Sequence, residues 1–158
     1  MVVHQKKFLH DKCVGSELLT RFNYGNIQFS TAEVFAYLDV FGIYSEFSKK
    51  ILRLHFQAAR KLGTPVSMNI RGDQFAQKDF VDFTREQIAL SGVDPDRLTF
   101  EILETQVLDL TIHGDSNSPT IENMRALKSL GMHFAVDDFG SGSNNAPFVA
   151  ELQSLNLF

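Results

Sequence analysis

The pattern of hydrophobic and polar residues divides this chain into short strand-like and helix-like segments, which turn residues separate. Residues 2–9 and 12–19 are typical of two strands joined at the turn His10-Asp11, which predicts a β-hairpin. Shorter apolar runs at 64–70, 98–103 and 133–136 predict three more strands, the first of them buried.

Helical patterns lie between these strands. Ser30 and Glu33 have capping-box spacing and predict a helix that continues to about Phe41. Further helices are predicted at 44–62, at 79–90, at 119–130 behind the N-cap Ser118, and at 148–155. The side chains expected to face the core are Phe47, Ile51, His55, Ala58 and Leu62, then Phe80, Phe83, Gln87 and Ile88, then Ile121, Met124 and Leu127. On such a stripe, His55 is more often a core histidine than a metal ligand.

Strands that alternate with amphipathic helices predict an α/β fold with a mostly parallel sheet covered by helices. The chain has 158 residues, 44% hydrophobic content and fifteen Phe, enough for a sizeable core, and we expect a single domain. The polar run at 111–119 predicts a surface excursion. Its His113 and Asp115 fit either a solvated loop or a metal site.

Charge and composition narrow the possible partners. A net charge of −4 and scattered basic residues leave no basic footprint for duplex DNA or RNA. The single Cys13 cannot form an internal disulfide and fits a reducing compartment. No apolar stretch approaches the roughly 18 residues of a membrane span, and the N-terminus lacks a signal-peptide core, so we expect a cytoplasmic protein without a membrane segment.

Acidic residues recur where the predicted strands end: Glu17, then Glu101 and Glu104, then Asp137 and Asp138. A single acid in such a place is usually solvated or caps a helix. Because the carboxyl ends of parallel strands share one rim, several acids there would converge as oxygen ligands. The recurrence therefore indicates a site for a hard divalent cation.

Four motifs stand in order along the chain: Glu-Leu-Leu-Thr-Arg at 17–21, Ser-Met-Asn-Ile at 67–70, Glu-Ile-Leu-Glu at 101–104, and Asp-Asp-Phe-Gly-Ser-Gly at 137–142. Together they resemble the EAL domain, the bacterial phosphodiesterase that cleaves cyclic di-GMP. The resemblance covers the whole chain. It implies a modified TIM-type (β/α) barrel with an antiparallel strand near the N-terminus, and a site at the C-terminal rim.

The resemblance also implies roles for particular residues. Glu17, Asn69, Glu101 and Asp137 would hold one Mg²⁺ or Mn²⁺, and Asp137 with Asp138 would hold a second. Two such ions can activate a water for in-line displacement, and the product would be the linear dinucleotide pGpG. Arg21 would approach a ligand phosphate, although a rim salt bridge is the alternative, and Gln5 would touch the nucleotide or be structural. The second motif Glu, Glu104, would position the loop after the Asp pair, so the expected catalytic residues are Glu17, Asp137, Asp138 and Glu104.

Departures from the family pattern leave two functions open. Leu18 replaces Ala, Phe22 replaces Trp, Arg71 replaces Ser, Leu103 replaces Thr, and the usual Tyr-Ser-Ser is Ser-Asn-Asn at 143–145. The chain also ends before the family's catalytic Lys and general-base Glu, so it corresponds to the N-terminal portion of the barrel. We expect little phosphodiesterase activity from this chain by itself, together with self-association through open strand edges. The parent protein would be an active phosphodiesterase, in which a sensory or diguanylate cyclase domain could adjoin this one. The alternative is a degenerate module that binds cyclic di-GMP or a protein partner without catalysis.

Overall fold

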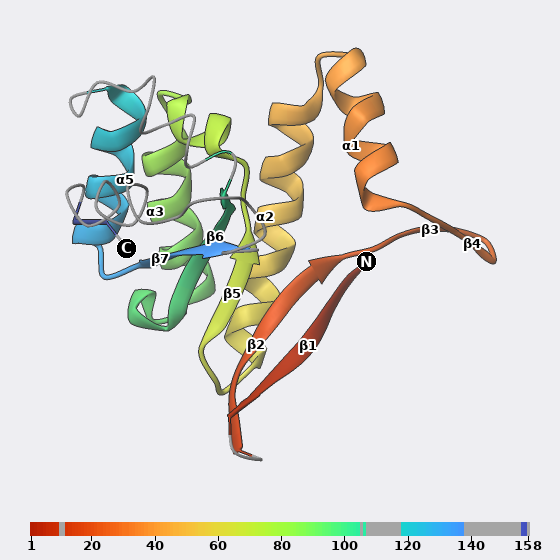
Figure 1. Ribbon diagram of the computed structural model, residues 1–158. Coiled ribbons are helices and arrows are strands. Elements are labelled where there is room, and N and C mark those ends of the chain that lie inside the picture. Colours follow the sequence, from red (N-terminus) through yellow and green to blue (C-terminus); the bar gives the residue numbers. More distant parts are fainter. Residues whose placement is uncertain (10–11, 105, 107–117, 138–155, 158) are drawn as a thin grey trace. The chain divides into compact units, whose positions relative to one another are not determined.

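The computed structural model describes residues 1–9, 12–104, 106, 118–137 and 156–157. They fall into two compact units, Met1–Val66 and Ser67–Phe158, which are described separately below (Figure 1). The predicted helix at 148–155 and the polar run at 111–117 lie outside the described residues. None of the described helices is long and apolar enough to cross a membrane.

The first unit begins with the predicted hairpin. Strands β1 (Val2–Leu9) and β2 (Lys12–Thr20) are antiparallel, and their register runs from Val2 opposite Thr20 to Leu9 opposite Lys12. A second, smaller hairpin follows, formed by β3 (Phe22–Tyr24) and β4 (Ile27–Phe29) around Gly25, whose φ is +58°. The sequence pattern did not predict this second hairpin, because three-residue strands are too short to show alternation.

Two helices complete the first unit. Helix α1 (Thr31–Val40) starts as predicted, with the Ser30 hydroxyl accepting a hydrogen bond from the Glu33 N–H at 3.5 Å. Helix α2 (Tyr44–Lys61) buries a stripe made of Tyr44, Ser48, Ile51, Leu52, His55, Phe56 and Ala59. The predicted Ile51 and His55 are confirmed, whereas Phe47, Ala58 and Leu62 are half-buried. The stripe is displaced because aromatic packing of Tyr44 on Phe35, with ring centroids 5.3 Å apart, buries the start of the helix.

Three strands form the open sheet of the second unit, in the order β5 (Val66–Asn69), β6 (Leu98–Leu103) and β7 (His133–Asp137). Strands β6 and β7 are parallel, with Glu101 opposite Ala135 and Leu103 opposite Asp137. Strand β5 runs beside β6 in the same direction (Figure 1). The predicted β6 bounds are confirmed, while β5 starts two residues later than expected.

The sheet of the second unit has one apolar face. Because side chains alternate along a strand, Met68, Phe100 and Phe134 share this face with Ile70 and Ile102. All five are buried. The rings of Phe100 and Phe134 contact Phe75, which in turn contacts Phe80 in an edge-to-face arrangement at 5.5 Å.

Helices supply the rest of this apolar layer. The 3₁₀ helix η1 (Gly72–Ala76) contributes Phe75, and α3 (Phe80–Ser91) buries Phe80, Val81, Phe83, Thr84, Gln87 and Ser91. Phe80, Phe83 and Gln87 were predicted to face the core, whereas Ile88 is only half-buried. A short 3₁₀ turn, η2 (Pro95–Arg97), leads into β6.

Helix α5 (Pro119–Ser129) follows the prediction closely. The Ser118 hydroxyl caps it by accepting a hydrogen bond from the Ile121 N–H at 3.4 Å. Its buried residues are Ile121, Met124 and Leu127, as the apolar spacing predicted. Gly131 lies between α5 and β7 and has a φ of +100°. Glycine adopts this backbone conformation readily, because it has no Cβ atom to clash.

Candidate functional site

The second face of the β5–β6–β7 sheet carries polar side chains. The Ile70 N–H donates to the Glu101 carbonyl at 2.9 Å, and in a parallel ladder this bond places Asn69 opposite Glu101. Glu101 is opposite Ala135, so Asp137 lies one step further along the same face. Three predicted site residues, Asn69, Glu101 and Asp137, therefore share one face of three neighbouring strands near their carboxyl ends.

Burial differs among these three side chains. Glu101 is only 9% exposed, Asp137 is half-buried and Asn69 is exposed. Glu104 follows β6 directly and is 5% exposed, so this acid is held inside the second unit rather than solvated. Two nearly buried carboxylates so close in sequence are unusual unless polar groups or a cation compensate their charge.

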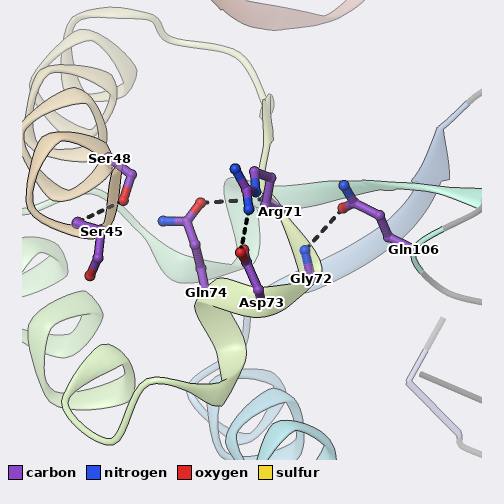
Figure 2. A network of polar contacts seen from close by, with 7 residues as sticks. All are labelled: Ser45, Ser48, Arg71, Gly72, Asp73, Gln74 and Gln106. Atoms are coloured by element: carbon purple, nitrogen blue, oxygen red, sulfur yellow. Dashed lines mark hydrogen bonds and ion pairs between the residues drawn. The ribbon is translucent and has the colours of Figure 1, made fainter. Parts of the chain in front are cut away.

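The turn after Asn69 is stabilised by side-chain contacts (Figure 2). The Gly72 N–H donates to Oε1 of Gln106 at 3.0 Å, and the Arg71 N–H donates to Oε1 of Gln74 at 3.4 Å. The Arg71 guanidinium pairs with Asp73, with Nη2 and Oδ2 2.5 Å apart. This turn is thus tied both to itself and to the segment that follows β6.

Helix α5 adds a further tie to the same region. Nδ2 of Asn123 donates to the Phe75 carbonyl at 2.7 Å and to the Gln77 carbonyl at 3.3 Å. Sequence reasoning missed Gln106 and Asn123, because both act on backbone groups 34 to 48 residues away. No local spacing signals such contacts.

In the first unit, the register of the hairpin places Gln5 opposite Glu17. Glu17 and Arg21 are four residues apart in extended backbone and so point to the same face, and Gln5 joins them there. One expectation needs correction: Glu17 is not at a strand end, because β2 continues for three residues to Thr20. The hairpin partner Met1 extends the pairing, since its carbonyl accepts from the Arg21 N–H at 2.8 Å.

The carboxyl end of β2 is held by several polar contacts. The Thr20 carbonyl accepts from Arg21 Nη1 at 2.9 Å and from Thr31 Oγ1 at 3.2 Å. The Thr20 hydroxyl lies 3.1 Å from Nε2 of His55, on α2. His55 is therefore a core histidine, as predicted, and burial lowers its pKa from the ordinary 6.5 to about 4.

The donor set is suited to a hard cation. On the shared face of the second unit, Asn69, Glu101 and Asp137 offer only oxygen ligands, and the amide of Asn69 adds a ligand without adding charge. Across the described ranges of the chain, no three His, Cys, Asp or Glu side chains come together as a metal-binding group. Asp138, the remaining predicted ligand, lies outside the described residues, as do His113 and Asp115.

Comparison with known protein families gives one match that spans nearly all of the chain. The sequence profile of the EAL domain matches residues 5–154. Among curated proteins, the cyclic di-GMP phosphodiesterase PdeB of Shewanella oneidensis is 30% identical over 87 residues, 55% of this chain. PdeA of Borreliella burgdorferi, also named a cyclic di-GMP phosphodiesterase, is 28% identical over 143 residues, 86% of this chain. The matches span only 10% and 20% of those relatives' own length.

Solved structures of EAL domains have the same fold as this chain. The EAL enzyme Bd1971 in its cAMP and cyclic di-GMP bound form matches with a TM-score of 0.78 and 18% identity, over 96% of this chain and 43% of that one. The Xanthomonas citri FimX EAL domain in complex with cyclic di-GMP matches with a TM-score of 0.75 and 16% identity, over 100% and 60% of the two chains. The predicted TIM-type fold, with its antiparallel strand near the N-terminus, is confirmed.

Proposed function

Because this chain belongs to the EAL domain family, we propose that its parent protein is a phosphodiesterase that hydrolyses cyclic di-GMP to the linear dinucleotide pGpG, with little activity expected from this chain by itself. The observation that best supports the proposal is the shared polar face of Asn69, Glu101 and Asp137. An apolar face would offer no oxygen ligands at the carboxyl ends of the strands, where barrel enzymes bind their substrates.

The proposal includes metal ions. Glu17, Asn69, Glu101 and Asp137 would hold one Mg²⁺ or Mn²⁺, and Asp137 with Asp138 would hold a second. When bound, such ions lower the pKa of a coordinated water and stabilise charge on the phosphoryl oxygens. The carboxylates of the chain fix where the cations sit, and the near burial of Glu101 keeps that carboxylate in one orientation.

Three further residues take part through their own chemistry. The Arg21 guanidinium offers a planar fork of donors to a phosphate oxygen, which suits it better than a Lys ammonium. Gln5, opposite Glu17 in the hairpin, would contact the nucleotide. Glu104 acts as a positioning residue for the segment that follows Asp138.

A cytoplasmic location belongs to the same proposal, since the exposed thiol of Cys13 is suited to a reducing compartment.

Chromatography of nucleotides tests the proposed reaction. We expect the parent protein with Mn²⁺ to convert cyclic di-GMP to pGpG, and Glu101→Gln in it to lose the activity at unchanged thermal stability. This chain by itself should show little conversion. Glu86→Gln is the matched control, because Glu86 is an exposed acid on α3 away from the strand ends. Full activity of the Glu101 variant would contradict the site, and absence of cleavage by the parent protein would contradict the enzyme.

A second candidate function is binding without catalysis. The replacement of the family's Tyr-Ser-Ser by Ser-Asn-Asn at 143–145 favours a module that binds cyclic di-GMP or a protein partner without cleaving it. Calorimetry that detects cyclic di-GMP binding to the parent protein, together with chromatography that detects no product from it, would support this alternative.

A further inference from the structure

The polar face of the second unit does not end at Asn69. Arg71 has φ −83° and ψ 141°, which is extended backbone, so strand alternation continues beyond the last residue of β5. A residue two positions after Asn69 has its Cβ on the same face as Asn69. Arg71 therefore adds a guanidinium to the face that carries Glu101 and Asp137.

The backbone around Arg71 is fixed on both sides (Figure 2). Its own N–H donates to Oε1 of Gln74, a side chain only 2% exposed. The next N–H, on Gly72, donates to Oε1 of Gln106 at 3.0 Å. Because the backbone is already ordered, placing the guanidinium against a ligand loses less conformational entropy than it would on a mobile loop.

The ion pair with Asp73 orients the Arg71 side chain without burying it. The two side chains are 31% and 55% exposed, and ion pairs this exposed contribute little to stability. A planar guanidinium has several donors and can contact a phosphate while it stays near a carboxylate. A simpler explanation is that the pair only stabilises the turn, and the two roles predict different effects of removing Asp73.

We propose that Arg71 is a substrate-binding residue that contacts a phosphodiester oxygen of the cyclic dinucleotide. The inference rests on the proposed function. A phosphodiester is an anion, and Glu101 and Asp137 would repel it. A cation on the same face, two residues after a proposed metal ligand, offsets part of that repulsion and favours a phosphate over an uncharged group.

Calorimetric titration with cyclic di-GMP tests the proposal, in buffer with Ca²⁺. We expect Arg71→Ala to weaken binding about tenfold to a hundredfold, the range for loss of a charged hydrogen bond. Arg71→Lys keeps the charge and should recover part of the affinity. Arg85→Ala is the matched control, because Arg85 pairs with Asp82 at the same 2.5 Å on α3.

Asp73→Asn distinguishes ligand binding from a structural role. If Arg71 binds the phosphodiester, removing its competing carboxylate leaves the affinity unchanged or tighter, while Arg71→Ala weakens it. If the ion pair only stabilises the turn, both variants lose affinity equally and the proposal is overturned. Wild-type affinity in Arg71→Ala would also overturn it and leave the proposed function intact. Absence of binding by the wild-type protein would instead overturn the proposed function, and the inference with it.

Discussion

At the scale of single residues, His55 is the clearest case of a side chain whose surroundings change its chemistry. It is 3% exposed, its Nε2 lies near the Thr20 hydroxyl, and its Nδ1 has no hydrogen-bond partner among the described residues. Such a site disfavours the imidazolium, which explains why the pKa falls to about 4. The same contact joins α2 to the strand that carries Glu17 and Arg21.

The lowered pKa of His55 predicts a pH-dependent stability. Above pH 6.5 the imidazole is neutral in both states and the full stability is present. As the pH falls from 6.5 to about 4, the unfolded chain takes up a proton that the folded chain does not, so stability is lost. The loss should approach about 3 kcal/mol at the lower pH.

Urea unfolding at pH 7 and pH 4.5 measures this loss. The difference between the two pH values should be smaller in His55→Gln than in the wild type. His4→Gln, which alters an exposed histidine on β1, should behave like the wild type. Equal pH dependence in the wild type and His55→Gln would show that His55 does not titrate as its burial indicates.

At the scale of elements, the sequence predicted those whose ends carry a local chemical signal. Ser30 and Ser118 are N-caps in the structure, and the bounds of β6 are as predicted. The β3–β4 hairpin and η1 were missed, since three-residue strands and 3₁₀ turns have no apolar period. The predicted strand ends likewise indicated where Glu101 and Asp137 lie, whereas Asn69 came from the family resemblance. Neither signal predicted the hydrogen bonds that Gln106 and Asn123 make to distant backbone groups.

The cap of α5 gives a prediction at this scale. Ser118→Ala removes the acceptor for the Ile121 N–H and should lower the free energy of unfolding by about 1 kcal/mol. Denaturant unfolding measures the change. Ser129→Ala is the control on the same helix, because its exposed hydroxyl donates to the Ala126 carbonyl and caps no N–H at the start of the helix. An equal effect of both substitutions would argue against the cap.

The hydrogen bonds from Asn123 to the η1 region give a second prediction at this scale. Asn123→Ala leaves the carbonyls of Phe75 and Gln77 without their amide donor and should destabilise the second unit by about 1 to 2 kcal/mol. Asn123→Asp is the informative companion, because a carboxylate of the same shape cannot donate to a carbonyl. Denaturant unfolding that found either variant as stable as the wild type would contradict a bracing role.

At the scale of the whole molecule, the proposed metal site depends on residues far apart in sequence. Calorimetry should show Mn²⁺ binding that Glu17→Ala and Asp137→Ala each abolish, because each removes an oxygen ligand. Glu86→Ala should bind like the wild type. Unchanged Mn²⁺ affinity in both ligand variants would remove the metal site from the proposal.

Self-association is a further expectation for the whole molecule. Most of the exposed large hydrophobic residues described in the first unit lie close together in sequence: Tyr24, Ile27, Phe29, Tyr37, Val40, Phe41 and Ile43. Exposed apolar residues of this kind favour contacts with other chains. Sedimentation should show association that rises with concentration and that Val40→Lys with Phe41→Lys reduces, while Leu90→Lys on α3 does not. A monomer at every concentration would contradict this.

The two faces of the β5–β6–β7 sheet also bear on how such a domain changes during evolution. Folding stability depends on the apolar face, where Phe100 and Phe134 pack on Phe75, and the proposed chemistry depends on the polar face. A substitution at Asn69 or Asp137 alters the second without removing a contact from the first. Substitutions on the polar face can therefore remove the proposed chemistry in a lineage while the fold persists, which leaves a stable domain free to take on another role.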